Sequence, residues 1–491
     1  PPAAPPAPPP PSSWYDRLLS SLPDAPPPAG GPAPPDVGDR RVLRVSAPMV
    51  GQSGYAFRRL VRRHGCDLAY TQMIHAGNVC KAARESKAAR RGGANAFIAQ
   101  SLDVMRDEVE AAGTLGRGGA GGGRAPPHVV VQVAGNSPES VSEAALRILE
   151  HVSAQHPSAD PLAAVSAIDL NVGCPQKIAR AGNYGAFLLH DPPLLLAILD
   201  RLVRTVHDAT DGRVGVTAKI RVLDDADATL ALVRDVADTG IDALCVHGRT
   251  VRENKTATGP ARWHAIARIV EEVGRGTPRG LPVFANGGVA VPADVARCAR
   301  ETGADGVMSS EALLEDPGLF ARGGRPVPPP AAMLRRQAGL AREYLALAAE
   351  HPPPVGGGGS PEAAVKSHVF KMLYCALERE DFRDLRDKLA DHDACRTMED
   401  ICAGTERVAD RIDRLLETLG DDLGPVQGWY GRHRKDAGSG ADIPLPPAVT
   451  AEERKAAARA RIEAMRQGRK EGRGFARSGG ENAGLEEASI A

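Results

Sequence analysis

The sequence predicts an α/β fold, a (β/α)8 barrel of the TIM type followed by a small all-helical domain. Between residues 41 and 325, eight short apolar runs alternate with segments of helical spacing, and beyond this range only the helical spacing continues. Strands that are apolar on both faces indicate a parallel sheet covered by helices, and eight units match the length of a barrel. An open doubly wound sheet is the alternative, but no G-x-G-x-x-G motif follows the first strand, which disfavours it.

The predicted strands are short runs with many β-branched residues. In chain order they cover residues 41–50, 67–74, 128–135, 167–173, 214–221, 243–250, 282–288 and 306–310. In the segments between them, apolar residues recur at intervals of three and four, which is typical of helices that pack on a sheet. The clearest helical segments are 137–152, 192–206, 228–240 and 293–303, and beyond the barrel 333–351, 360–378 and 410–420.

Composition divides the chain into four parts. Residues 1–40 are rich in Pro and Ala and are predicted to be a disordered tail, because they bury too little apolar surface to offset the entropy of ordering. Residues 41–325 form the predicted barrel and residues 331–422 the helical domain. Residues 423–491 are predicted to be a basic tail, partly helical or disordered, that is either solvated or contacts phosphates.

The overall composition points to no global electrostatic partner and to a reducing environment. The 61 basic and 61 acidic side chains balance, and the eight cysteines are scattered without a C-x-x-C pair. This pattern disfavours a metal site and a disulfide framework. We therefore expect the protein to be located in the cytoplasm or the nucleus. No apolar run is long enough for a membrane helix. The first residue is proline, so we expect the natural start to lie upstream and assign no targeting segment.

Polar side chains gather at the carboxyl ends of the predicted strands, where barrels of this type keep their active sites. Lys219 stands out, because an unpaired lysine inside a barrel is costly and needs an anionic or electron-rich partner. Other strands end in Gln132, Asn171, His247 and Asn286. Each of these has a structural explanation by itself, but together they favour a shared ligand site.

The last two strands end in turns that suit a phosphate. Asn286, Gly287 and Gly288 follow the seventh strand, and Ser310 and Glu311 follow the eighth, where many barrels hold a phosphate with backbone N–H groups.

On the middle strands, Gln132 can pair with the imide edge of a flat heterocycle. Lys219 and His247 can stabilise a reduced, negatively charged ring. A phosphate joined to a reducible ring indicates FMN.

The segment DLNVGCPQK, residues 169–177, places Cys174 between glycine and proline where an apolar strand ends. A cysteine that only packs in the core would lie within the strand. Glycine permits and proline restricts the backbone at this turn, so the thiol is predicted to be presented to a ligand rather than buried.

These residues resemble the tRNA-dihydrouridine synthases, and most closely the eukaryotic branch that acts on positions 16 and 17. The resemblance is carried by APMVGQSGYAFRRLVRRHG, DLNVGCPQKIARAGNYGAFLL, VTAKIRV, LCVHGRT, PVFANGGV and GVMSSEALLEDP, in the order of the family from residue 47 to residue 320. It implies an FMN-binding barrel with a helical domain that binds tRNA, NADPH or NADH as reductant, and reduction of uridine to 5,6-dihydrouridine. No metal, membrane or obligate protein partner is expected.

The resemblance also implies roles for individual residues. Cys174 is expected to be the general acid that protonates C5 of uracil. The expected flavin contacts are Pro48, Met49 and Val50 at the ring, Gln132, Lys219 and His247 at its polar edge, and Asn286, Gly287, Gly288, Ser310 and Glu311 at the phosphate. The candidates for substrate binding are Asn171, Lys177, Arg180 and Arg221.

Three features depart from the family pattern. Gln72 stands where relatives often carry proline or glutamate, so it is given no flavin contact. The glycine-rich insert at 113–124 and the basic tail have no counterpart in the family.

Three alternatives remain: a dihydroorotate-dehydrogenase-like flavoenzyme that acts on a free pyrimidine, a non-catalytic RNA-binding paralogue, and a phosphosugar isomerase. The last requires a catalytic carboxylate at a central strand end, and none is assigned.

Overall fold

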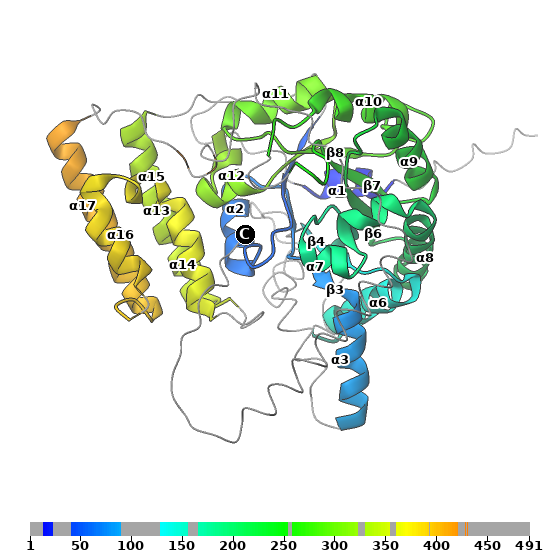
Figure 1. Ribbon diagram of the computed structural model, residues 1–491, viewed down its shortest axis with the longest axis horizontal. Coiled ribbons are helices and arrows are strands. Elements are labelled where there is room, and N and C mark those ends of the chain that lie inside the picture. Colours follow the sequence, from blue (N-terminus) through cyan, green and yellow to red (C-terminus); the bar gives the residue numbers. More distant parts are fainter. Residues whose placement is uncertain are drawn as a thin grey trace, which may run out of the picture. The chain divides into compact units, whose positions relative to one another are not determined.

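A closed parallel β-barrel forms the core of the computed structural model (Figure 1). Its strand segments follow the order β2-β1-β9-β8-β7-β6-β5-β4-β3, and a pairing between β2 and β4 closes the ring. Since β2 and β3 both pair with β4 and follow each other in the chain, they occupy one barrel position. The eight-stranded barrel predicted from the sequence is thereby confirmed.

The strands coincide with the predicted apolar runs. Their bounds are β1 (Leu43–Ser46), β2 (Leu68–Tyr70), β3 (Ile74–His75), β4 (His128–Ala134), β5 (Val165–Val172), β6 (Gly215–Arg221), β7 (Ala243–His247), β8 (Val283–Asn286) and β9 (Gly306–Ser309). The structure describes residues 13–22, 41–89, 128–155, 165–253, 258–322, 329–353, 360–391, 393–420, 428 and 430. The glycine-rich insert and, apart from residues 428 and 430, the predicted basic tail lie outside these ranges.

Helices cover the outer face of the barrel (Figure 1). They are α2 (Tyr55–Arg63), α3 (Ala76–Ala89), α6 (Pro138–Gln155), α8 (Pro192–Thr210), α9 (Ala226–Asp238), α10 (Trp263–Val273) and α11 (Pro292–Thr302), with short α7 (Lys177–Ala181) and α12 (Glu311–Glu315) and 3-10 segments η2 (Gly185–His190) and η4 (Leu319–Arg322). Their apolar faces and the outward side chains of the strands form one continuous core. None of the described helices is long and apolar enough to cross a membrane.

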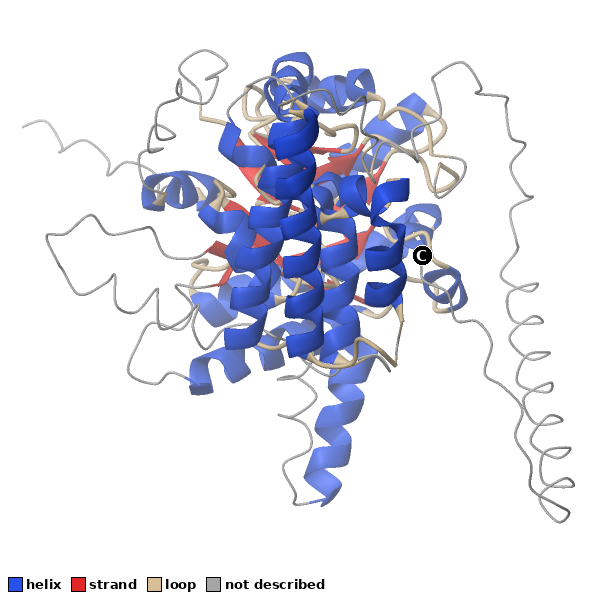
Figure 2. Ribbon diagram, turned by 90° about the vertical axis from the view of Figure 1, so that its left-hand side faces the viewer, coloured by secondary structure: helices blue, strands red, loops and turns tan. Residues whose placement is uncertain are grey.

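A second group of helices lies against one side of the barrel (Figure 2). It consists of α13 (Pro330–Glu350), α14 (Pro361–Met372), α15 (Tyr374–Leu377), η5 (Glu380–Phe382), α16 (Arg383–Ala390) and α17 (Met398–Leu419). Helix α13 packs on α2 of the barrel and on α14 and α17 of its own group. These helices occupy the range in which the sequence predicts only helical spacing.

Residues 13–22 correct the prediction of a disordered segment over 1–40. They contain helix α1 (Trp14–Ser21), which Ser13 caps by accepting a hydrogen bond from Asp16 N–H. Trp14, Tyr15 and Leu18 are buried against the inward-facing side chains at the amino ends of the strands. The Pro-rich composition obscured a short amphipathic segment, SSWYDRLLSSL, whose apolar residues bury enough surface to order it.

Specific polar contacts hold α1 in the barrel. Trp14 Nε1 donates to Ser166 O at 2.6 Å, and the Tyr15 hydroxyl donates to Asp305 O at 3.0 Å. At Gly215 a β-carbon would lie only 2.7 Å from the Trp14 ring, so the glycine makes room for the indole. Helix α1 therefore closes the amino-terminal end of the barrel.

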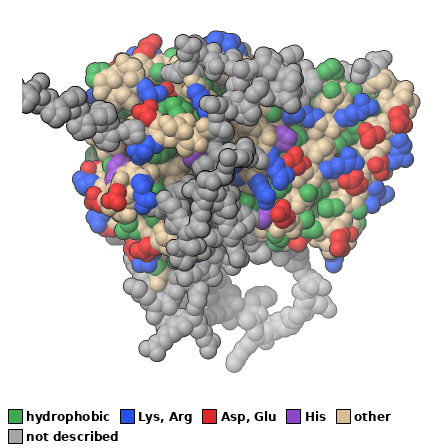
Figure 3. Space-filling view, turned by 180° about the vertical axis from the view of Figure 1, so that it is seen from behind, with side chains coloured by type: hydrophobic (Ala, Val, Ile, Leu, Met, Phe, Trp, Pro, Cys, Tyr) green, Lys and Arg blue, Asp and Glu red, His purple; other side chains and the backbone are tan. Residues whose placement is uncertain are grey.

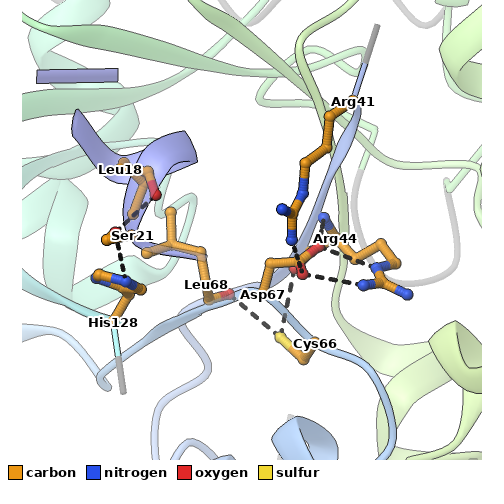
Figure 4. A network of polar contacts seen from close by, with 8 residues as sticks. All are labelled: Leu18, Ser21, Arg41, Arg44, Cys66, Asp67, Leu68 and His128. Carbon is orange, nitrogen blue, oxygen red and sulfur yellow. Dashed lines mark hydrogen bonds and ion pairs between the residues drawn. The ribbon is translucent and has the colours of Figure 1, made fainter. Parts of the chain in front are cut away.

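Figure 4 shows polar contacts at this closed end. His128, at the start of β4, bonds through its two ring nitrogens to Ser21 Oγ at 2.9 Å and Ser166 Oγ at 3.0 Å. Burial lowers the pKa of His128 to about 4. Arg44 of β1 and Asp67, which immediately precedes β2, form a two-point ion pair with bonds of 2.9 Å.

Candidate active site

On the central strands β5 and β6, the side chains that face the barrel interior become polar toward the carboxyl ends. On β5, Ala167 lies in the apolar interior, and Asp169 and Asn171 follow at intervals of two. Successive side chains of a strand alternate between its two faces, so all three face inward. By the same alternation Thr217, Lys219 and Arg221 of β6 face inward. The closed and polar parts of the interior are thus successive sections of the same strands.

Cys174 lies on the loop after β5, where the sequence places it, and its side chain is half-buried. Its backbone N–H and that of Gly173 donate to Asn171 Oδ1 at 3.0 and 3.1 Å, while Arg221 Nε donates to Gly173 O at 2.8 Å. At Gly185 the backbone φ is +64°, and a β-carbon would lie 2.9 Å from Cys174 O. The loop that carries the thiol is therefore fixed from three sides.

The environment of Cys174 favours the protonated thiol. Burial raises its pKa above the ordinary value, although Arg221 and Lys219 act in the opposite direction. A group that is to donate a proton has to carry it at neutral pH. The thiol is thus suited to act as an acid rather than as a nucleophilic thiolate.

Lys219 lies at the polar end of the interior and makes no hydrogen bond or ion pair with another residue that the structure describes. It is aligned with Asn171 on β5 and with Cys245 on β7. Burial lowers the pKa of its ammonium group, and Asp169 and Cys174 are among the neighbouring groups that raise it. The ammonium group can therefore bind an electron-rich atom of a ligand.

His247, at the end of β7, is neutral and has a defined tautomer. Burial and the nearby Arg221, Lys219 and Arg249 hold its pKa well below the ordinary value. Arg249 Nη1 lies 3.2 Å from His247 Nε2. Because a guanidinium only donates, Nε2 accepts and the ring proton resides on Nδ1, which makes that atom a donor.

Two positions in the turn after β8 require glycine. Gly287 and Gly288 have φ values of +97° and +78°. A β-carbon at Gly287 would lie 2.7 Å from the His247 ring, and one at Gly288 would lie 3.1 Å from Trp263 Nε1. Asn286 Nδ2 donates to Met308 O at 3.0 Å and joins this turn to β9, which ends next to Ser310 and Glu311.

The loop after β1, which contains Pro48, Met49 and Val50, contacts the second helical group. Gln72 Oε1 accepts from Gly51 N at 3.0 Å, which gives this residue a role in holding the loop. Gln52 Oε1 accepts from Lys371 Nζ of α14 at 3.1 Å. Val50 is 58% exposed, so its side chain is available to a ligand.

The four predicted substrate-binding residues fall into two groups. Lys177 and Arg180 are exposed on α7 and make no ion pair with another described residue. Asn171 and Arg221 are buried. Arg221 donates to Gly173 O and, through Nη1, to Thr250 O at 2.9 Å, so this guanidinium holds backbone next to the thiol.

Asp169 is a buried carboxylate for which the sequence predicted no role. It is completely buried and accepts from Gln132 Nε2 at 2.8 Å and from the Thr217 hydroxyl at 2.7 Å. Burial raises its pKa to about 6, against the two hydrogen bonds and Lys219. The sequence did contain an indication of its position: Asp169 precedes Asn171 by two residues, so both side chains lie on the inward face of β5.

A scan against family models matches residues 45–398 to the dihydrouridine synthase family. The chain belongs to this family. It is 31% identical to the tRNA-dihydrouridine(16/17) synthase [NAD(P)(+)] of Saccharomyces cerevisiae over 80% of this chain and 81% of the relative. It is 34% identical to the tRNA-dihydrouridine(16/17) synthase [NAD(P)(+)]-like protein of Rattus norvegicus over 79% of this chain and 72% of that protein.

The Schizosaccharomyces pombe tRNA-dihydrouridine(16/17) synthase is 31% identical over 71% of this chain and 73% of its own length. The family resemblance stated from the sequence is confirmed by these matches. As a dihydrouridine synthase, the chain places its GCPQ, KIR and HGRT segments at the carboxyl ends of β5, β6 and β7. The family motifs thus surround a single end of the barrel.

Proposed function

We propose that this dihydrouridine synthase reduces uridine to 5,6-dihydrouridine at positions 16 and 17 of the tRNA D-loop, with FMN as cofactor and NADPH or NADH as reductant. The observation that carries the proposal is the half-buried Cys174 thiol, which Asn171, Arg221 and Gly185 hold at the same barrel end as Lys219 and His247. The names of the similar proteins support the substrate and the reductant.

The residues at this end fit FMN. The ammonium of Lys219, which is unpaired among the described residues, and the donor on His247 Nδ1 suit the polar edge of a flavin ring, because both favour electron density there. The turn of Gly287 and Gly288 after β8, together with Ser310 and Glu311 after β9, is the proposed site of the phosphate, because barrels of this type often hold a phosphate at the ends of these strands. Pro48, Met49 and Val50 on the loop after β1 are the proposed contacts to the face of the ring.

In the proposed reaction this chain supplies the proton and the positioning. FMN, when bound, supplies to C6 of uracil the hydride that originates from NAD(P)H. Cys174 donates its thiol proton to C5, which completes the addition across the C5–C6 double bond, and the resulting thiolate regains a proton from solvent. The raised pKa of Cys174 keeps this proton in place until the base is bound.

The exposed cations on α7 are the proposed contacts to RNA. The target uracil has to turn out of the folded tRNA to reach the thiol, and Lys177 and Arg180 lie just after Cys174 in the chain. They are placed to bind phosphates or uracil carbonyls as the base enters. On the second helical group, acidic and basic side chains are interspersed over the face in Figure 3, and we propose that this group contacts the body of the tRNA.

We also propose a cytoplasmic or nuclear location, on the basis of the scattered cysteines, which remain free thiols in the described residues.

Mapping of the product tests the proposed function. The purified protein is incubated with NADPH and unmodified tRNA, and dihydrouridine is located by sequencing of reduced or cleaved product. We expect modification at positions 16 and 17 and none in tRNA with cytidine at both positions. Modification only at another uridine would contradict the proposed position, and conversion of free uridine at an equal rate would contradict tRNA as the substrate.

A further inference from the structure

A directed chain of hydrogen bonds links Asp169 to the backbone of Cys174. The Cys174 N–H donates to Asn171 Oδ1 at 3.0 Å, and Asn171 Nδ2 donates to Gln132 Oε1 at 2.8 Å. Gln132 Nε2 then donates to Asp169 Oδ2 at 2.8 Å. Every donor in this series points toward the carboxylate.

The direction of the chain follows from the chemistry of its last member. An ionised carboxylate only accepts hydrogen bonds, whereas the two side-chain amides can each be turned either way. With its pKa near 6, Asp169 is ionised at neutral pH. It therefore presents only acceptors to Gln132, which turns its Oε1 toward Asn171, and Asn171 in turn directs Oδ1 toward the loop.

The side chains that form this series of hydrogen bonds, Asn171, Gln132 and Asp169, are all buried. Gln132 is 1% exposed and Asp169 is 0% exposed. In such an environment consecutive hydrogen bonds strengthen one another, and an unpaired donor is costly. A turned amide at either link would leave two donors or two acceptors facing each other.

We infer that Asp169 is a positioning residue that fixes the loop of the proposed proton donor through Gln132 and Asn171. The inference deepens the proposed function and rests on it for the role of Cys174. Among the described residues, the carboxylate of Asp169 accepts hydrogen bonds from Gln132 and Thr217, so it acts on the loop of the thiol through Gln132.

Asp169 has a second consequence for the same site. Lys219 and Asp169 influence each other electrostatically without forming an ion pair. The carboxylate thus offsets part of the cost of the half-buried ammonium group while leaving its hydrogen-bonding positions available to a ligand.

Alkylation of Cys174 tests the inference. Full-length protein is treated with iodoacetamide, at saturating FMN and without it, and labelling of Cys174 and Cys402 is followed by peptide mass spectrometry. Cys402 is also half-buried but lies on α17, so it is the internal control. Asp169→Ala is expected to accelerate labelling of Cys174 about tenfold. The substitution leaves Gln132 Nε2 without an acceptor, so Gln132 and Asn171 no longer hold the loop of Cys174 in one position.

Two matched variants separate positioning from simple packing. Asp169→Asn keeps an acceptor for Gln132 and a donor for the Thr217 oxygen, and is expected to stay within about twofold of the wild type. Thr217→Val removes the other partner of Asp169 and leaves the chain intact, so it is also expected to stay within about twofold.

Gln132→Met removes the hydrogen bond between Gln132 and Asn171 and is expected to accelerate labelling of Cys174 as much as Asp169→Ala does. If Cys402 also becomes reactive in Asp169→Ala, that variant is unfolded in part and Gln132→Met takes its place in the comparison. The inference is overturned if neither Asp169→Ala nor Gln132→Met accelerates Cys174, or if Asp169→Asn accelerates it as much as Asp169→Ala. The labelling requires no turnover, so a wild-type protein that forms no dihydrouridine counts against the proposed function alone.

Discussion

The two ends of the barrel are made by the same strands but have opposite chemistry. At the amino-terminal end, Ala167, Gly215 and Ala243 are small and leave space that α1 fills with Trp14. Two to six residues further along the same strands, the inward positions become polar. Residues that stabilise the barrel and residues that carry its chemistry are therefore separated along the strand axis, as expected for this type of barrel.

The contrast also appears in how buried polar groups are satisfied. At the closed end, Trp14 Nε1 and the His128 ring have partners within the protein. At the open end the Lys219 ammonium makes no hydrogen bond within the described residues, and His247 Nδ1 carries a proton that it can donate. The Lys219 ammonium and His247 Nδ1 are therefore the donors at the open end that a ligand can bind.

Removal of the thiol is expected to have the largest effect on activity. Cys174→Ala should slow dihydrouridine formation by about two to four orders of magnitude, the usual contribution of a positioned acid. Binding of flavin and tRNA should persist, because the loop is held through backbone atoms. Cys402→Ala is the control, and near-normal turnover by Cys174→Ala would remove the thiol from its assigned role.

Removal of the indole at the closed end is expected to affect stability instead. Trp14→Ala should lower the free energy of unfolding by about 3–5 kcal/mol, the usual cost of deleting a large buried aromatic side chain. The measurement is urea denaturation, with Ser20→Ala on the exposed side of α1 as the control. An unchanged unfolding midpoint for Trp14→Ala would show that α1 does not close the barrel.

A smaller effect is expected from the pH dependence of stability at the closed end. The folded-state pKa of His128, about 4, lies below the ordinary value of 6.5. Its contribution to stability is therefore fully present above pH 6.5 and is lost as the pH falls toward 4. Arg62 acts in the same direction as burial and Asp67 acts against it.

From pH 7 to pH 5 this loss amounts to about 2 kcal/mol in the free energy of unfolding. Urea denaturation at both pH values measures it, and His128→Gln should lose that part of the slope. An equal slope in the variant and the wild type would assign the pH dependence to other groups.

The sequence predicted the barrel strands because parallel strands that are buried on both faces are apolar throughout. It also predicted the thiol loop, because glycine and proline around Cys174 mark a turn at a strand end. Helix α1 was missed, since the surrounding Pro and Ala dominate the composition there. The sequence did not indicate a role for Asp169, because its partners Gln132 and Thr217 come from other strands that only the closed barrel brings together.

The absorbance of the purified protein tests the central claim, that the polar end of the barrel holds a redox cofactor and a nucleobase of tRNA. We expect a yellow protein whose colour NADPH bleaches, and whose colour returns on addition of tRNA with uridine at positions 16 and 17 but not on addition of free uridine. A colourless protein that also fails to bind added FMN would contradict the claim, as would a bleached protein that tRNA leaves colourless.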